Sequence, residues 1–221
     1  MSTTIYVISL GVITHQKVIN MAFTNYSELQ KSIANWCDRD DMGPFIPDFI
    51  ALCEARFNRE LRLRSMEQKW EADTVGGQAN YSLPPNFLQM REFRLNTNPT
   101  ASLRYVSPEI YESWNLGSGQ PTFYTIIANE IRLGPVPAGV YNMEMLYWAK
   151  FPNLNGTTPT NWMLQNAPDV YLYGSLLELE PFIQNDARIN VWAAGYQKAV
   201  SDIQLQDDKD RHSGSALTVQ N

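Results

Sequence analysis

The stretch NAPDVYLYGSLLELEPFIQNDARINVW, residues 166–192, decides the fold class of this chain. Its apolar residues recur at helical spacing, and this pattern predicts two capped amphipathic helices joined by a very short connection. We expect Asn166 to cap the first helix, Pro181 to kink or end it, and Asn185 with Asp186 to cap the second. The stretch contains no group typical of a catalytic centre, so it predicts a structural element.

A similar pair of helices opens the body of the chain. The spacing predicts helices over Tyr26–Arg39, capped by Asn25, and over Pro47–Met66. In the last helix of the chain an apolar stripe continues for four turns, and it consists of Ile189, Trp192, Ala193, Tyr196, Ala199, Val200 and Ile203. We expect Trp36 and Trp192 in the core, because both fall on apolar stripes.

The region between the two helix pairs has the short, punctuated pattern of β-strands. We predict a hairpin over Thr74–Leu83 with its turn at Gly76–Gly77, a second hairpin around Ala128–Asn129, and a short helix over Pro108–Trp114. The other predicted strands are Phe87–Leu95 and Tyr141–Lys150.

This order of elements predicts the α+β class. We expect an α-helical bundle formed by the N- and C-terminal helix pairs, with an inserted antiparallel β domain. The expected parts are an upstream extension (1–20), the first half of the bundle (21–66), the inserted β domain (67–161), the second half of the bundle (162–206) and a C-terminal tail (207–221).

The amino-acid composition argues against several classes of protein. The 221 residues are 44% hydrophobic and 12% aromatic, which excludes a mainly disordered chain. The formal net charge of −6 argues against a protein that binds duplex nucleic acid, because such a protein needs clustered Lys and Arg. The acidic balance suits a surface that DNA passes without sticking. Cys37 and Cys53 fall on separate predicted helices, and we expect both to be reduced.

The first twenty residues differ from the rest of the chain. The apolar run Ile5–Ile13 is too short to span a bilayer, and no Lys or Arg precedes it as in a signal peptide. Met21 begins a segment that resembles a natural start. We therefore expect residues 1–20 to be an upstream extension from a misplaced start codon.

A search for catalytic chemistry finds little. The two histidines, His15 and His212, lie near the termini, and no metal-ligand spacing, phosphate loop, dinucleotide fingerprint or nucleophile elbow is present. The sequence thus predicts no cofactor and no metal. Paired carboxylates stay open as a glycan-cleaving site, with Glu109, Glu112, Glu130 and Glu144 as candidates. Trp114, Trp148 and Trp162 could stack on sugars, or pack in the core or between subunits.

Two other segments are candidates for contacts with partners. The predicted second helix carries Arg56, Arg59, Arg62 and Arg64, which could meet an acidic neighbour or form a solvated face. After Leu205 the chain becomes polar. We interpret Lys209–Asn221 as a tail that is flexible unless a partner orders it.

The chain as a whole resembles a known family. Five segments follow one another in the order seen in phage head–tail adaptor proteins. They are MAFTNYSELQKSIANW, FIPDFIALCEARFNRELRLR, YSLPPNFLQMREFRLN, FYTIIANEIRLGP and the stretch 166–192 quoted above. This family is common in podoviruses and prophages and is similar to the tail tubular protein A group. The resemblance extends over residues 21–214, and the extension 1–20 departs from it.

The resemblance implies a structural virion protein at the head–tail junction, assembled in the host cytoplasm. Twelve copies would form a ring beneath the portal protein and attach the tail nozzle protein, without enzymatic activity, membrane contact or sequence-specific nucleic acid. It also implies that a C-terminal segment docks on the portal, and the residues at these positions are Asp207, Asp208, Lys209, Asp210, Arg211, His212, Leu217 and Val219.

Two alternatives remain open at this point. The chain could be a tail component that binds or hydrolyses host surface polysaccharide through Glu109, Glu130 and Glu144 or through its loop tryptophans. It could also be another connector of the same tail. The candidate surface between neighbouring subunits is the arginine face at Arg56, Arg59, Arg62 and Arg64.

Overall fold

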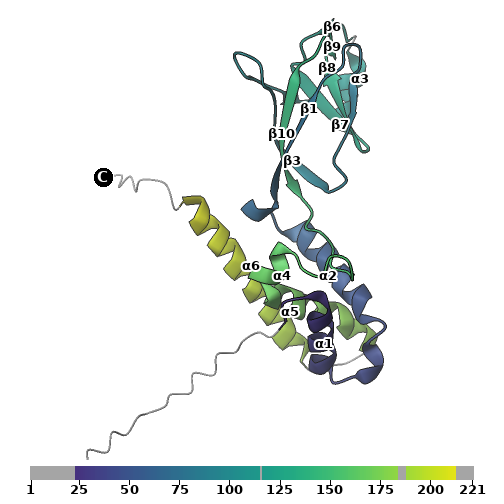
Figure 1. Cartoon of the computed structure of the whole chain (residues 1–221), viewed down its shortest axis with the longest axis vertical. Helices are drawn as coiled ribbons and strands as arrows, with labels where there is room; N and C mark the ends of the chain where they lie inside the picture. Colours follow the sequence, from purple (N-terminus) through teal and green to yellow (C-terminus); the bar gives the residue numbers. More distant parts are fainter. Residues whose placement is uncertain (1–22, 115, 184–187, 213–221) are drawn as a thin grey trace, which may run out of the picture.

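The computed structural model describes residues 23–114, 116–183 and 188–212. The chain forms a helical module and a β domain, which lie at opposite ends of a long molecule and meet at a narrow waist (Figure 1). The α+β class expected from the sequence is confirmed. The predicted cap at Asn185 and Asp186 and the predicted extension 1–20 lie outside the described residues.

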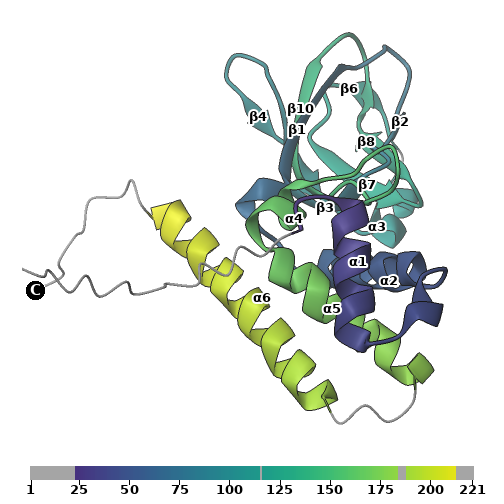
Figure 2. The same ribbon diagram turned by 60° about the horizontal axis from the view of Figure 1, so that its bottom comes forward.

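The helical module contains elements from both ends of the chain. Its helices are α1 (Tyr26–Cys37), α2 (Ile46–Glu60), α4 (Trp162–Asn166), α5 (Pro168–Ile183) and α6 (Ile189–His212), with the 3₁₀ turns η1 (Asp40–Met42) and η2 (Arg64–Met66). Helix α5 lies at the centre, because α1, α2 and α6 all pack against it. Figure 2 shows α1 in front of α5, while α6 runs along the side of the module.

Local chemistry explains where these helices begin. The Asn25 side chain accepts a hydrogen bond from the N–H of Glu28 at 3.0 Å, as expected for the cap of α1. The prediction for Asn166 is wrong, because Asn161 is the cap of the preceding short helix and accepts from the N–H of Leu164 at 2.9 Å. Asn166 is instead the last residue of α4.

Helix α2 is shorter than the sequence predicts. It ends at Glu60, and the chain then runs extended through Leu61 and Leu63, both buried, into η2. We call Leu61–Met66 the neck, since it leads from α2 to the β domain. In the sequence, Leu61 and Leu63 look like a continuation of the apolar stripe of the helix, although they are buried from an extended segment. This resemblance explains why the predicted end of the helix at Met66 is wrong.

One close contact joins the two halves of the module. A Cβ atom added at Gly174 of α5 would collide with the sulfur of Cys53 on α2, so glycine permits the approach of these helices. Cys53 is fully buried, and burial raises the pKa of its thiol, which keeps it protonated. Cys37 and Cys53 are both free, as expected.

A buried polar cluster fixes the loop that returns from the β domain. One Glu54 oxygen accepts from the N–H of Leu154 at 2.8 Å and from the Tyr171 hydroxyl at 3.0 Å. Asn161 donates to Tyr171 Oη at 2.6 Å and to the Pro152 carbonyl at 2.8 Å. Burial raises the pKa of Glu54, and the bonds from Leu154 and Tyr171 counter part of this rise.

The core of the helical module combines residues from all its helices and from the return loop. Trp192 is buried as predicted, but Trp36 is 42% exposed, so its assignment to the core is wrong. Cys37 takes its place on the buried stripe of α1, after Leu29 and Ile33. Trp36 packs edge-on against Tyr173 at the surface, with ring centroids 5.8 Å apart.

The β domain is a sandwich of two four-stranded sheets. The first sheet has the order β1 (Glu67–Asp73), β10 (Asn142–Ala149), β3 (Phe87–Leu95), β4 (Ala101–Ser102). The second has the order β2 (Asn80–Ser82), β8 (Glu130–Gly134), β7 (Phe123–Ile127), β5 (Arg104–Tyr105). Helix α3 (Pro108–Ser113) packs against β7, and β6 (Ser118–Gly119) pairs with β9 (Val136–Pro137).

A single core lies between the two sheets. Phe93 of the first sheet meets Tyr124 of the second edge-to-face at 5.1 Å, and both are buried with Met143, Met145 and Leu133. Along β10 every second residue is buried, so the intervening residues form the outer face of the first sheet.

The pairing of strands differs from the prediction in two respects. The hairpin around Ala128–Asn129 is present, but Thr74–Leu83 is not a hairpin, because β1 pairs with β10 and β2 pairs with β8 in the other sheet. The domain is also not purely antiparallel. β5 runs parallel to β7 and β6 runs parallel to β9, each over two residues.

The contact at Gly174 predicts a specific sensitivity. We expect Gly174→Ala to lower the free energy of unfolding by about 1–2 kcal/mol, because overpacking outweighs the better helix propensity of alanine. Denaturant unfolding measures this difference. The matched control is Gly43→Ala, since an added Cβ there meets nothing within 4 Å. Equal stability of Gly174→Ala and the parent would contradict the close packing of α2 on α5.

Candidate functional site

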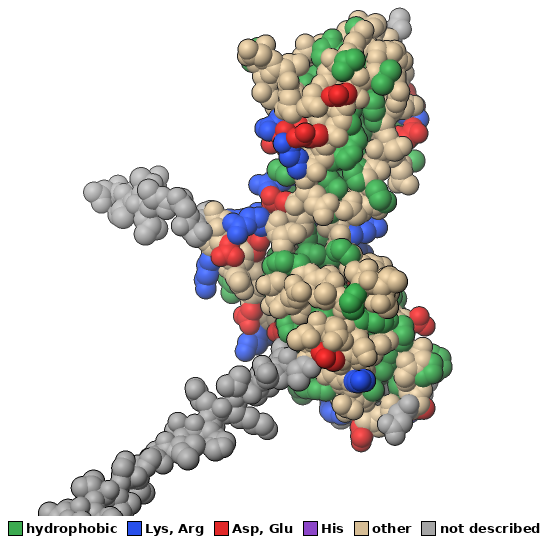
Figure 3. Space-filling view, in the orientation of Figure 1, with side chains coloured by type: hydrophobic (Ala, Val, Ile, Leu, Met, Phe, Trp, Pro, Cys, Tyr) green, Lys and Arg blue, Asp and Glu red, His purple; other side chains and the backbone are tan. Residues whose placement is uncertain are grey.

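The end of helix α6 reaches the neck. Ile203 is the last buried apolar residue of α6 among those described, and the helix continues for more than two further turns. Charged side chains gather there beside the waist of the molecule (Figure 3). Polar contacts, and no further apolar packing, therefore hold the end of α6.

These contacts join the arginines after α2 to the C-terminal segment, two groups of residues far apart in the sequence. Asp207 accepts a hydrogen bond from the backbone N–H of Arg64 at 2.7 Å, and Arg64 Nη1 donates to the Asp210 carbonyl at 3.0 Å. Arg211 donates to Asp207 Oδ2 at 2.7 Å and to the Arg62 carbonyl at 3.2 Å. We call this set of contacts between α6 and the neck the neck clasp.

A hollow lies beneath the clasp. Its volume is about 330 Å³ and its lining includes Arg64 and Ser65 of the neck, Trp162 of α4, and Ile203 and Asp207 of α6. Trp162 is stacked on Phe151 with an interplanar angle of 4°, so one ring face is already occupied within the chain. The end of α6 thus spans a cavity and rests on its polar rim.

The segment predicted as a C-terminal tail is helical over its described residues. Asp207, Asp208, Lys209, Asp210, Arg211 and His212 all belong to helix α6. Asp208 and Lys209 are exposed, whereas Asp207 and Arg211 are engaged by the neck. Leu217 and Val219 lie outside the described residues. The helical stripe ends at Ile203, and polar contacts that no sequence pattern reveals carry the helix further.

The four arginines do not form one face. Arg56 donates through Nε to Glu178 of α5 at 2.6 Å, and its guanidinium lies 5.6 Å from the ring centre of Tyr196. Arg59 is exposed on α2 and borders a separate hollow. Arg62 and Arg64 lie beyond the helix, in the neck. The sequence predicts a single arginine face because its pattern predicts a helix that continues to Met66.

The candidate carboxylates for glycan cleavage are divided among three elements. Glu144 is in β10 of the first sheet, Glu130 opens β8 of the second sheet, and Glu109 and Glu112 are in α3. No hydrogen bond joins any two of them in the described part of the chain. Of these carboxylates, Glu144 is held by basic and amide side chains of its own sheet.

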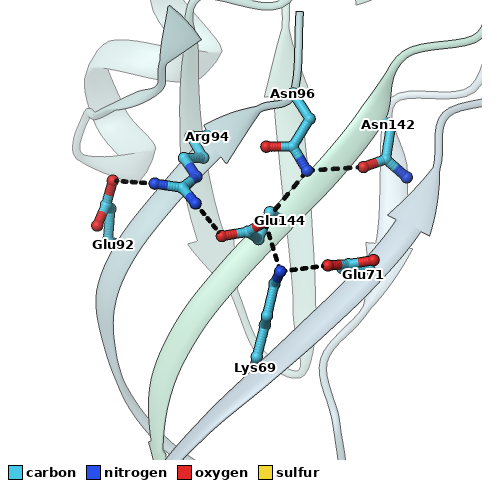
Figure 4. Close-up of polar contacts among 7 residues, drawn as sticks. All are labelled: Lys69, Glu71, Glu92, Arg94, Asn96, Asn142 and Glu144. Carbon is cyan, nitrogen blue, oxygen red and sulfur yellow. Dashed lines mark hydrogen bonds and ion pairs between the residues drawn. The ribbon is translucent and has the colours of Figure 1, made fainter. Parts of the chain in front are cut away.

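Glu144 has a structural role on the outer face of the first sheet (Figure 4). Its carboxylate pairs with Lys69 at 2.8 Å and with Arg94, and it accepts from Asn96 at 3.1 Å. Lys69 also pairs with Glu71 of β1. The bonds from Lys69, followed by those from Asn96 and the charge of Arg94, lower the pKa of Glu144.

The loop tryptophans pack within the chain. Trp114 meets Phe123 edge-on at 4.7 Å, Trp148 lies under the guanidinium of Arg91 at 5.8 Å, and Trp162 stacks on Phe151. Such contacts favour the packing role over a sugar platform. Within the described ranges, no three His, Cys, Asp or Glu side chains gather as metal ligands, and no helix is long and apolar enough to cross a membrane.

Comparison with known proteins adds one match. A family model described as SU10 adaptor protein matches residues 24–220, which include the helical module, the β domain and the end of α6. No curated protein matches the chain. The match leaves out residues 1–20 and begins at Thr24, just before helix α1.

The cluster around Glu144 predicts a pH-dependent loss of stability. Because the pKa of Glu144 is lowered in the folded state, its contribution is present above its unfolded pKa, near 4.5, and is lost as the pH falls through the lower folded value. We expect Glu144→Gln to be less stable than the parent at pH 7 and nearly equal to it in strong acid. Urea unfolding at both pH values measures the difference. An equal difference at both would contradict the assigned charge pairing.

Proposed function

Because this chain belongs to the SU10 adaptor protein family, a family of phage head–tail adaptors, we propose that it is a structural virion protein that joins the head to the tail. The family match over residues 24–220 carries this proposal, because it includes both halves of the helical module and the inserted domain together. We propose that copies of the chain form a ring of twelve beneath the portal protein and attach the tail nozzle protein.

The elongated shape supports a connecting role. The helical module and the β domain lie at opposite ends of the molecule, so one end can meet the portal side while the other meets the tail (Figure 1). We assign the portal to the helical module, because the residues expected to dock, Asp207–His212, belong to its helix α6 and lie beside the waist. The protein would then lie at the head–tail junction of the virion.

The net charge fits a protein that surrounds passing DNA. A formal charge of −6 leaves a surface that repels phosphates, and repulsion lets DNA slide without being held. The proposal requires no enzymatic step and no cofactor. It also requires no sequence-specific contact with nucleic acid.

Contact between neighbouring copies needs a surface, and we propose the exposed side of α2. Of the four predicted arginines, Arg59 is on this side, next to the exposed Ala51, Leu52 and Ala55. Leu52 is 50% exposed and, with the exposed Ala51 and Ala55, makes part of this side apolar. Small flanking side chains would let an element of the next copy approach closely. A ring contact is heterologous, so this side would meet a different surface of its neighbour.

The docking role predicts the effect of a deletion. Removal of residues 207–221 should leave the protein folded, because the buried residues of α6 end at Ile203. The deleted form should no longer bind portal rings in a pull-down, while its unfolding midpoint stays close to that of the parent. Removal of 213–221 alone separates the part beyond α6 from the helical part. Normal portal binding without 207–221 would overturn the docking role.

The subunit contact predicts the effect of a charge on α2. Leu52→Glu should prevent or weaken ring assembly on the portal by at least about tenfold, because a buried unpaired charge is costly at an interface. Native mass spectrometry of portal complexes counts the bound copies. The matched control is Val191→Glu, where the side chain is 64% exposed and belongs to α6 and not to the proposed side of α2. Full rings of Leu52→Glu would contradict the assignment.

A further inference from the structure

We infer that the neck clasp is autoinhibitory: the neck and the portal compete for the same acidic side chains at the end of α6. This inference rests on the proposed docking of residues 207–221. Three of the residues expected to dock are already engaged within the chain, since Asp207, Asp210 and Arg211 all contact Arg62 or Arg64. Docking through these groups therefore requires that they first leave the neck.

The chemistry of the clasp makes it suited to exchange. Asp207 uses both oxygens, one for the backbone N–H of Arg64 and one for Arg211. Asp210 lies 3.9 Å from the Arg64 guanidinium through its carboxylate and accepts from Arg64 through its backbone carbonyl. A partner that offers guanidinium groups or free backbone N–H groups can replace each of these donors. The competing site on the portal is therefore expected to be basic.

The outer ion pair of the clasp is weak, whereas Asp207, whose side chain is 12% exposed, forms the inner contact. The Arg64 and Asp210 side chains are 54% and 52% exposed, and exposed ion pairs add little to stability and are screened by salt. A hollow of about 330 Å³ lies beneath the end of α6, so its displacement disturbs no packed core. Ile203 and Ala199 would hold the rest of the helix in place, since both are buried.

Competition of this kind lowers the apparent affinity for the portal by the fraction of molecules in which the clasp is open. A free subunit would then bind weakly by itself. Several subunits on one portal ring would bind through their combined contacts, which compensate for the weak single affinity. The clasp thus favours assembly on the portal over premature contacts of single subunits elsewhere.

The test changes the neck and leaves the docking segment intact. Arg64→Glu places a carboxylate beside Asp207 and Asp210 and should open the clasp by repulsion. We expect two results: faster amide hydrogen exchange over residues 204–211 of the free protein, and portal binding tighter by roughly two- to tenfold. The control is Arg104→Glu, the same charge change at an exposed position of β5, which should alter neither quantity.

The outcomes separate this inference from the proposed function. If deletion of 207–221 abolishes portal binding but Arg64→Glu binds as the parent does or more weakly, docking stands and the competition is wrong. If exchange over residues 204–211 is unchanged in Arg64→Glu, the contacts do not restrain the helix and the clasp is wrong. Normal binding by the deletion variant overturns both. Circular dichroism of Arg64→Glu checks that the helical content is preserved.

Discussion

The structure depends on the contact between helices α2 and α5. These helices are far apart in the chain, since Cys53 and Val170 are separated by 117 positions, and the whole β domain lies between them. Apolar burial alone does not fix how closely they approach. Gly174 sets the distance, because only a residue without a side chain fits against Cys53. The buried Glu54 then ties the return loop to both helices through Leu154 and Tyr171.

This contact explains why the β domain can be inserted without disturbing the helical module. The chain leaves the module through the neck and returns through the loop that begins at Phe151, and both connections are anchored in the helical core. The β domain has a separate core between its two sheets. The two anchored connections hold the two cores apart from each other. A protein that connects two larger structures requires such an arrangement. The end of α6 adds a polar contact at the same waist, where the neck can release it.

Much of this architecture can be predicted from the sequence. Asn25 is a strong cap signal, and the stripe of Leu29 and Ile33 on α1 needs only helical spacing. The strand Phe87–Leu95 was predicted with the bounds that the structure has, because Pro84 and the turn after Leu95 delimit it. Family resemblance, carried by segments from the whole chain, predicted the family that the comparison shows.

The remaining errors have a common cause: they depend on partners distant in sequence. Gly76–Gly77 looks like a hairpin turn, but the strands on either side pair with β10 and β8. In the sequence Arg56 has the pattern of a surface charge, but in the fold it donates to Glu178 of α5. The end of α6 looks like a tail, because the donors that hold it come from Arg64, 143 positions away. The sequence therefore predicts the arginines and the C-terminal segment as two separate candidate sites. Only the folded chain brings them together.

We propose that this protein connects the phage head to its tail. The decisive measurement is averaged imaging of the virion, with the protein identified by a bound antibody fragment. We expect a ring of density between the portal and the nozzle, with the helical module towards the portal and the β domain towards the tail. Label at the tail tip, on the fibres or in the head interior, and none at the junction, would contradict it.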